Sequence, residues 1–567
     1  MREWTEAQLT AITASGCDLL VSAAAGSGKT AALTERLIRK LTDAEAPAEL
    51  SRMLIVTFTR PAAAELRERI GKALSEAIEA EPHRRDLVRQ SLNLAGAHIG
   101  TIHSFCLSLI RTNFAALGLD PAVRTADENE ALTVALSVMD GLIADRYAKS
   151  ERTDLTEAER ERCDAFIRLT DTFVTDRDDG LAAFMYGVYV QTRNYTVGEA
   201  VISDSADALR RGAETDFFST VWGKEIKSGI AGELSYYEKI YAEAVRYFAA
   251  DEALEKKYGA AFAADLEFIR ALAAALGSGY SEASAAAQAY KKKAVGRTSV
   301  PDDKKIIFYK SARDGFDKFR KSLCAKLALP QDRISDIMRR SAGLCDSLYD
   351  LISEFSERYS AEKSRRGMID FSDIEHLALK LLTDKDGAPT DIAKQTAAQF
   401  DEIYIDEYQD INPVQDMIFR SVARGNRFMV GDIKQSIYGF RGAAPEIFSD
   451  YRSAFPKYGT KADAGTEVQI PPPAAGCGHI SGAAEDIPPC GYTAGVPESG
   501  FPCGHTVGAE ENVFPDRHIA DVSAKNRNSA SDLAGRNEIG RTVYLSHNFR
   551  CDITVGSKNI ITVNDSK

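Results

Sequence analysis

The sequence has no long hydrophobic run, and no apolar stretch approaches the ~18 residues that a membrane-spanning helix needs. Its N-terminus lacks the charged, apolar and small-residue pattern of a secretory leader. The nine cysteines are scattered without even pairing, which argues against a disulfide framework and predicts a protein of the reducing cytoplasm. A basic excess is missing too, because the net charge is −13. Any nucleic-acid binding would therefore depend on local basic strips.

Length and composition predict several domains with a substantial core. The chain has 567 residues, of which 44% are hydrophobic. Because single domains usually hold about 100–200 residues, we expect roughly three or four units.

The most informative stretch is the apolar run that begins at Leu19, breaks into small residues and ends in Lys29-Thr30. It satisfies the pattern G-x-x-x-x-G-K-[ST] with Ala23 in place of the first glycine. We interpret it as a phosphate cradle between a strand, Asp18 to Ser22, and a helix that continues through Leu37. The alternative is a chance turn of small residues. The expected nucleotide-contacting residues are Ala23, Ala24, Ala25, Gly26, Ser27, Gly28, Lys29 and Thr30.

Two further strand ends carry polar or aromatic side chains. The strand from Arg52 to Thr59 leads into a helix that starts at Pro61, so Phe58 and Arg60 suit a groove for single-stranded nucleic acid. Core packing is the alternative for Phe58. A third strand and turn, Ala97 to Cys106, places His103 either in a polar site or as a satisfied core residue.

Residues from about 120 to 364 differ from the rest, with long charge-laced helical stretches and few glycines or prolines. Within them lies a strip of basic residues. A solvated helix face and a phosphate-tracking role are both open for it. Its members are Lys291, Lys292, Lys293, Arg297, Lys304, Lys305, Lys310, Arg313, Lys318, Arg320 and Lys321.

The α/β pattern returns at Met368 and becomes sharp at Phe400 to Asp410, where an apolar strand delivers two adjacent carboxylates. Asp406 suits a magnesium ligand, and Glu407 suits a base that deprotonates the attacking water. Acidic pairs are common in turns, so the pair gains its meaning from the cradle.

A final strand, Arg427 to Asp432, leads into a loop that ends at Ala443. This loop combines a glutamine, two aromatic residues and an arginine. We expect it to couple the nucleotide state to the grip on a nucleic-acid strand. The residues concerned are Gln435, Tyr438, Phe440 and Arg441.

Taken in order, these motifs resemble those of UvrD-type superfamily 1 DNA helicases. The wording Ile437-Tyr438-Gly439-Phe440-Arg441, the segment Met368 to Phe371 and the long helical region are most similar to the AddA-type helicase–nuclease subunits of bacterial AddAB complexes. The resemblance covers about residues 1–455 and resumes at Tyr544 to Arg550.

The resemblance implies a role for each matching residue. Gln8, which alone would be a surface residue, would read the adenine of ATP, and Phe549 would stack on it. Lys29 and Thr30 would hold phosphates and Mg²⁺, with Asp406 serving the metal, Glu407 the water and Gln435 the γ-phosphate. Arg550 would act as an arginine finger. The DNA-contacting residues would be Phe58, Thr59, Arg60, His103, Tyr438, Phe440 and Arg441.

The resemblance also implies a RecA-like P-loop NTPase lobe, a parallel α/β sheet built from residues 1–120 and 365–457. Residues 121–364 would form an inserted α-helical subdomain. Residues 458–540 read as a disordered or foreign Pro/Gly-rich stretch, since eight of the 18 prolines lie between 471 and 515. Residues 541–567 would begin a truncated second lobe, with the nuclease domain absent.

The Pro/Gly-rich stretch contains Cys477, Cys490 and Cys503, whose spacing does not match the C-x₂₋₄-C arrangement of zinc ligands. We expect no metal there. Cys551 is expected to be a buried thiol.

Two functions from different classes follow. The first is an ATP-dependent helicase that moves 3′ to 5′ on single-stranded DNA and opens duplex ends for recombinational repair. It would pair with an AddB-like partner in a heterodimer and would not use a membrane. The second is a non-catalytic module that binds ATP and single-stranded DNA as half of a motor. The aromatic loop from Gln435 to Arg441 disfavours a metabolic ATPase.

Overall fold

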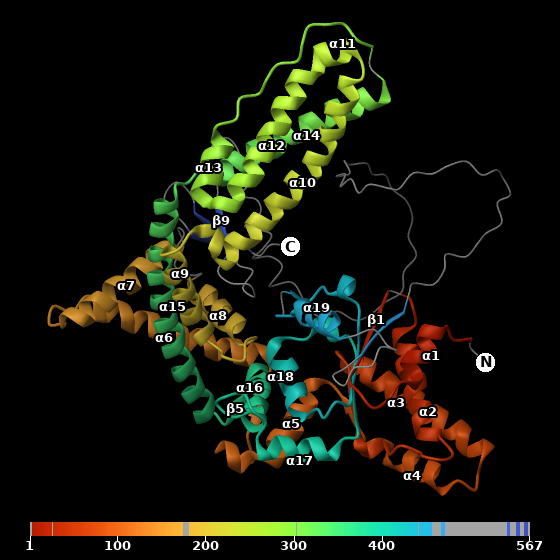
Figure 1. Cartoon of the computed structure of the whole chain (residues 1–567). Coiled ribbons are helices and arrows are strands. Elements are labelled where there is room, and N and C mark those ends of the chain that lie inside the picture. The colour runs from red at the N-terminus through yellow and green to blue at the C-terminus, as the bar shows by residue number, and fades with distance from the viewer. Residues whose placement is uncertain are drawn as a thin grey trace, which may run out of the picture. The chain divides into compact units, whose positions relative to one another are not determined.

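The computed structural model describes residues 3–24, 26–173, 181–301, 303–439, 442–455 and 466–470, together with the backbone of three strands between 541 and 564. This part of the chain is mostly helical with one large parallel sheet (Figure 1). No helix within it is long and apolar enough to cross a membrane.

Six parallel strands form the large sheet in the order β3-β2-β6-β7-β1-β8. Side chains alternate between the two faces, as a pleated strand requires. Leu54 and Val56 enter one hydrophobic core, whereas Met53 and Ile55 enter the other. Both faces are therefore buried, which is typical of parallel sheets. The strands are β1 (Leu19–Ala23), β2 (Met53–Val56), β3 (His98–Gly100), β6 (Glu402–Ile405), β7 (Arg427–Gly431) and β8 (Thr466–Ile470).

Two sets of helices cover this sheet (Figure 1). One face carries α1 (Glu6–Thr13), α2 (Lys29–Thr42), α3 (Arg60–Ala80) and α4 (Arg85–Asn93). The other carries α5 (Ile102–Thr112), α16 (Phe371–Leu382), α17 (Asp391–Gln399), α18 (Pro413–Val422) and α19 (Pro445–Ala454).

The second and third expected strands are shorter than the sequence suggested. β2 ends at Val56, because the next three residues form a turn in which the Thr57 hydroxyl donates to the Thr59 carbonyl at 3.0 Å. Thr59 then caps α3 by accepting the N–H of Ala62 at 3.2 Å. Likewise, His103 lies in the first turn of α5 and not on a strand.

A helical region follows, and its two ends are paired. β4 (Arg124–Thr125) precedes it and β5 (Met368–Ile369) follows it, and they pair with each other in parallel. The α/β pattern expected to return at Met368 is therefore a two-stranded pairing outside the large sheet. The helices between are α6 (Glu128–Ser150), α7 (Glu157–Phe173), α8 (Leu181–Thr192), α9 (Ala200–Ala213), α10 (Val221–Ala249), α11 (Glu252–Leu254), α12 (Ala260–Ser278), α13 (Tyr280–Gln288), α14 (Lys304–Lys326) and α15 (Gln331–Arg365).

The helical region has two hydrophobic cores. The first gathers α6 to α9 around the long helix α15, and the second gathers α10, α12, α13 and α14 into a bundle (Figure 1). The division into an inserted subdomain and flanking lobes remains our prediction.

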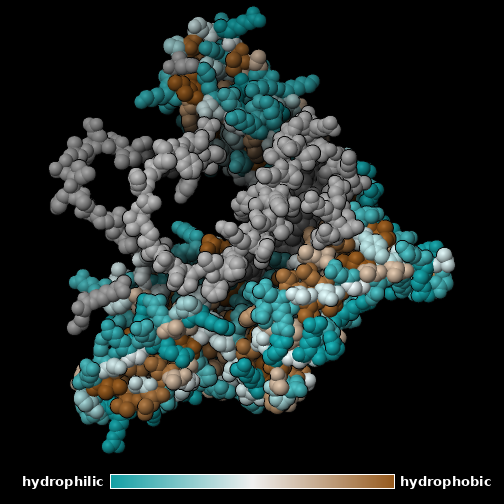
Figure 2. Space-filling view, turned by 180° about the vertical axis from the view of Figure 1, so that it is seen from behind, coloured by the Kyte–Doolittle hydropathy of each residue, from teal (hydrophilic) through white to brown (hydrophobic). Residues whose placement is uncertain are grey.

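Part of the basic strip in the helical region is neutralised internally. Asp317 pairs with Lys292, Arg320 and Lys321 at 3.5, 3.1 and 3.0 Å. Hydrogen bonding from Lys321 is the largest of the effects that lower the pKa of Asp317 to about 2. Arg313 is buried and pairs with Asp265 at 2.7 Å. These pairs favour a structural, solvated face over phosphate tracking, and polar residues cover much of the described surface in Figure 2.

The expectation of an unstructured stretch over residues 458–540 is wrong at Thr466–Ile470. These residues form β8, which pairs with β1 in register from Leu19↔Thr466 to Ala23↔Ile470. The reason is local alternation, since Val468 and Ile470 are buried in the core between the sheet and α1 to α4. The last described strands, β9 (Arg541–Tyr544), β10 (Asp552–Val555) and β11 (Ile561–Asn564), form a separate antiparallel sheet.

A buried ion pair aligns β1 with β7. Arg427 donates to Asp18 from Nε at 3.1 Å and from a terminal nitrogen at 2.6 Å, and its backbone N–H donates to the same carboxylate. Both side chains are buried. This pair fixes the starts of the two neighbouring strands whose ends carry the cradle and the aromatic loop.

We expect Asp18→Asn to lower the free energy of unfolding by about 3–5 kcal/mol, because it leaves the buried Arg427 charge without a carboxylate. Denaturant unfolding of the purified chain measures this change. The double variant Asp18→Asn/Arg427→Met should lose less, since both charges are gone. As a matched control, Asp401→Asn breaks the exposed Arg52–Asp401 pair and should cost less than about 1 kcal/mol. Equal losses at both sites would contradict this account.

Candidate nucleotide and DNA site

The cradle turns sharply between β1 and α2. Gly26 and Gly28 have φ values of 71° and 84°, which side chains with a Cβ rarely adopt, and α2 begins directly after Gly28. The Ser27 hydroxyl is buried and has no hydrogen-bond partner in the part of the chain that the structure describes. An unsatisfied buried donor beside a helix N-terminus fits a phosphate ligand. Ala25 lies outside the described residues.

Lys29 lies at the centre of a closed ring of hydrogen bonds. Its Nζ donates to Gln435 Oε1 at 2.8 Å and to Glu407 Oε2 at 3.3 Å. Gln409 Nε2 donates to the same Glu407 oxygen at 2.9 Å, while Gln409 Oε1 accepts the backbone N–H of Asp432 at 2.9 Å. Gln435 Nε2 donates to Asp432 Oδ2 at 2.9 Å and completes the ring.

The two carboxylates at the end of β6 differ in environment. Burial, followed by the neighbouring charge of Glu407, raises the pKa of Asp406 to about 6. Glu407 is the one non-glycine residue with a positive φ, 51°, in the described part of the chain. Such backbone strain in a non-glycine residue typically marks a functional position.

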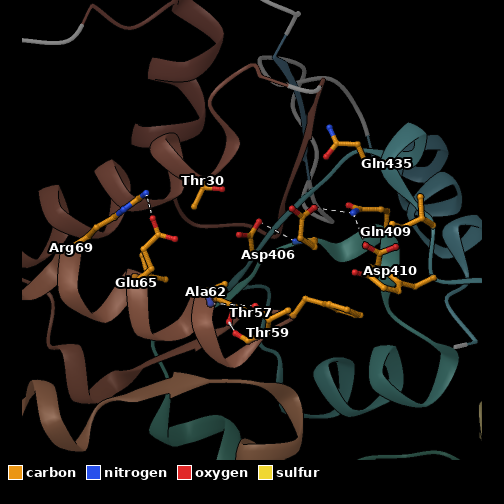
Figure 3. Close-up of a pocket in the computed structure, with 15 residues that line it drawn as sticks. Thr30, Thr57, Thr59, Ala62, Glu65, Arg69, Asp406, Gln409, Asp410 and Gln435 are labelled. Carbon is orange, nitrogen blue, oxygen red and sulfur yellow. Dashed lines mark hydrogen bonds and ion pairs between the residues drawn. The ribbon is translucent and has the colours of Figure 1, made fainter. Parts of the chain in front are cut away.

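These groups line a cavity of about 330 Å³. Figure 3 shows Thr30 near Asp406, with Glu65 and Arg69 of α3 on one side and Gln409 and Gln435 on the other. The lining is Thr30, Thr57, Phe58, Thr59, Ala62, Glu65, Leu66, Arg69, Asp406, Glu407, Gln409, Asp410, Gln435, Ile437 and Tyr438. The Thr30 hydroxyl and the Asp406 carboxylate are the oxygen ligands that Mg²⁺ prefers.

Gln8 lies against the cradle and not on a free surface. Its Nε2 donates to the Ser27 carbonyl at 2.8 Å, and its Oε1 accepts the N–H of Thr5 in a capping box at the start of α1. One donor and one acceptor position of the amide remain for an adenine edge. Arg36 holds the other end of α1, donating to the carbonyls of Ala11 and Ile12 at 3.2 Å.

The aromatic residues meet at the far end of the same cavity. The rings of Phe58 and Tyr438 lie 4.7 Å apart with an interplanar angle of 31°. Thr59 and Arg60 are exposed beside them, whereas His103 lies elsewhere, with its Nε2 3.2 Å from Glu375 Oε1. Four predicted residues lie outside the described part of the chain: Phe440, Arg441, Phe549 and Arg550.

Comparison with known proteins identifies the family. The UvrD/REP helicase N-terminal domain matches residues 4–456. The chain belongs to the UvrD/REP helicase family. The resemblance drawn from the motifs is thereby confirmed.

Curated relatives of this UvrD/REP family chain include three proteins whose names describe an ATP-dependent helicase/nuclease subunit of the AddA type. Those of Clostridium beijerinckii and Acetivibrio thermocellus are each 35% identical to it, over 461 and 475 residues. That of Clostridioides difficile is 33% identical over 463 residues. The matches cover 79%, 81% and 79% of this chain but only 36%, 37% and 35% of the relatives. The chain thus spans little more than a third of the length of these relatives.

Metal ligation follows the same limits of description. No group of three or more His, Cys, Asp or Glu side chains that could hold a metal ion occurs among the described residues. Cys477, Cys490, Cys503 and Cys551 lie outside them.

Sequence reasoning gave no role to two residues that complete the ring in this helicase family chain. Gln409 is buried and links Glu407 to Asp432. Gly431 makes this link sterically feasible, because a Cβ there would lie 2.6 Å from Gln409 Oε1 and 2.8 Å from the Phe448 ring. The available signal was an amide and a glycine directly beside the carboxylate pair and the loop.

We expect Gln409→Met to lower the free energy of unfolding by about 1–3 kcal/mol, because the buried N–H of Asp432 loses its acceptor. The comparison is a denaturant melt beside Gln399→Met, an exposed glutamine at the end of α17. An equally small effect at both positions would show that the ring contributes nothing to stability.

Proposed function

We propose that this chain is the ATP-hydrolysing part of a DNA helicase subunit. In this proposal, ATP hydrolysis drives 3′ to 5′ movement on single-stranded DNA and opens duplex ends during double-strand break repair by homologous recombination. The direction and the repair role rest on the AddA-type resemblance and on the helicase/nuclease names of the relatives.

The observation that carries the proposal is the position of Lys29. One ammonium group joins the cradle to the base candidate Glu407 and to Gln435, which precedes the aromatic residue Tyr438 by three positions. A nucleotide phosphate that binds Lys29 competes with both contacts. Binding is thereby linked to the carboxylate that activates water and to the loop that carries Tyr438.

In the proposed reaction, water attacks the γ-phosphorus, its proton passes to Glu407, and the bond to the bridging oxygen of ADP breaks. Lys29 stabilises the charge that develops on the phosphate oxygens. Gln435 contacts the γ-phosphate while its Nε2 remains bound to Asp432. Mg²⁺, when bound, offsets charge on the β- and γ-phosphates, and Thr30 and Asp406 would hold it.

DNA binding is proposed at the aromatic end of the cavity. Phe58 and Tyr438 are already stacked on each other, so rings are available for stacking against bases, and Thr59 and Arg60 are exposed nearby for phosphates. Gln8 at the cradle is the proposed adenine reader. The proposed roles of His103, Phe440, Arg441, Phe549 and Arg550, and an AddB-like partner, rest on the resemblance.

ATP hydrolysis with and without single-stranded DNA tests the proposal. We expect turnover that DNA stimulates and that Lys29→Ala and Glu407→Gln each reduce by at least about 100-fold. Nucleotide binding should be lost in Lys29→Ala and kept in Glu407→Gln. Lys394→Ala, which removes an exposed lysine on α17, is the matched control and should leave turnover unchanged.

Two results would change this assignment. Turnover that survives both substitutions would contradict the proposed site. Lys29-dependent nucleotide binding without turnover would favour the alternative, a non-catalytic module that binds ATP and single-stranded DNA.

A further inference from the structure

The turn after α8 connects the helical region to α16. Arg193 pairs with Asp373 Oδ1 at 3.6 Å, and its Nε donates to the Ser372 hydroxyl at 3.4 Å. His376 Nε2 lies 2.8 Å from the Arg193 carbonyl. Burial lowers the pKa of His376 to about 4, so the neutral ring donates its hydrogen to this carbonyl at pH 7. Arg193 therefore contacts three positions in the first two turns of α16.

The next residue of the same turn, Asn194, lies against the aromatic loop. A Cβ placed on Gly442 would overlap the Asn194 side chain. Gly442 has a φ of 81°, and it closes a turn in which its N–H donates to the Gly439 carbonyl at 3.0 Å and the Ala443 N–H donates to the Tyr438 carbonyl at 3.2 Å. Asn194 thus packs directly on the turn that positions Tyr438.

The other proposed DNA-contacting group depends on α16. His103 contacts Glu375 at 3.2 Å, and its ring lies edge-on to Phe371 with centroids 5.6 Å apart. Both partners are on α16. Two separate contacts, Asn194 to the loop and Arg193 to α16, therefore link one turn of the helical region to both proposed DNA-binding elements.

A second contact secures the helical region to α16. Lys363, near the end of α15, is buried and pairs with Asp370 at 2.8 Å and with Asp373 at 2.5 Å. Asp373 therefore receives charge from both α15 and the turn after α8. Such a shared carboxylate links the positions of two helices of the region to one point on α16.

We propose that the turn Arg193-Asn194 is a joint through which the helical region positions the Tyr438 turn and the His103 side chain for DNA. Arg193 and Asn194 are positioning residues in this proposal, which rests on the proposed function for its DNA readout. A displacement of the helical region would alter the grip on DNA without touching the nucleotide contacts of Lys29.

Binding of fluorescently labelled oligodeoxythymidylate to the purified chain tests the joint. We expect Asn194→Ala to raise the dissociation constant about 3–30-fold, as coupling through a packed network does, with nucleotide affinity unchanged. Gly442→Ala should also weaken binding, and its effect should be smaller in the Asn194→Ala background, where the overlapping side chain is gone. Additive effects would contradict the contact as the cause. Asn129→Ala, an exposed asparagine on α6, is the matched control.

Hydrogen exchange without ligands provides a readout that is independent of the proposed function. Amides between Ser436 and Ala444 should exchange at least about threefold faster in Asn194→Ala, but not in Asn129→Ala. Unchanged exchange overturns the joint, whatever the DNA result. A native chain that binds no single-stranded DNA refutes the proposed function, and with it the DNA role of the joint, while exchange still decides whether the turn holds the loop.

Discussion

The arrangement of this protein depends on one ammonium group held between two strand ends. Lys29 reaches Glu407 at the end of β6 and Gln435 after β7. These contacts require that the cradle after β1 lie beside both ends, and the sheet order β6-β7-β1 provides this. Because the carboxyl ends of parallel strands meet at one edge, residues about 380 and 400 positions apart in sequence form a single site.

Buried polar groups fix this arrangement more than the loops do. Asp18 and Arg427 align β1 with β7 at one end, and Gln409 joins β6 to β7 at the other. Arg36 ties α1 to α2 and thereby holds Gln8 at the cradle. Each of these groups is costly to leave unpaired in the interior, so the register of the strands is closely specified.

The sequence predicted the site well where chemistry and local pattern coincide. Lys29, Asp406, Glu407 and Gln435 follow apolar strands, and the structure brings them together. Contacts between distant segments could not be predicted in this way. The pairing of β4 with β5, the addition of β8 beside β1 and the neutralisation of Arg313 by Asp265 depend on tertiary partners that no local pattern specifies. Gln409 was missed because a buried amide has no distinctive local pattern.

Hydrogen exchange over residues 431–439 in Lys29→Met, compared with the native chain, tests the central claim most directly. The substitution preserves side-chain bulk but removes the ammonium group, so Gln435 loses its donor. The account predicts several-fold faster exchange in this segment, with exchange in α16 unchanged. Unchanged exchange over 431–439 would show that Lys29 does not hold the loop, and would contradict the proposed link between nucleotide binding and the grip on DNA.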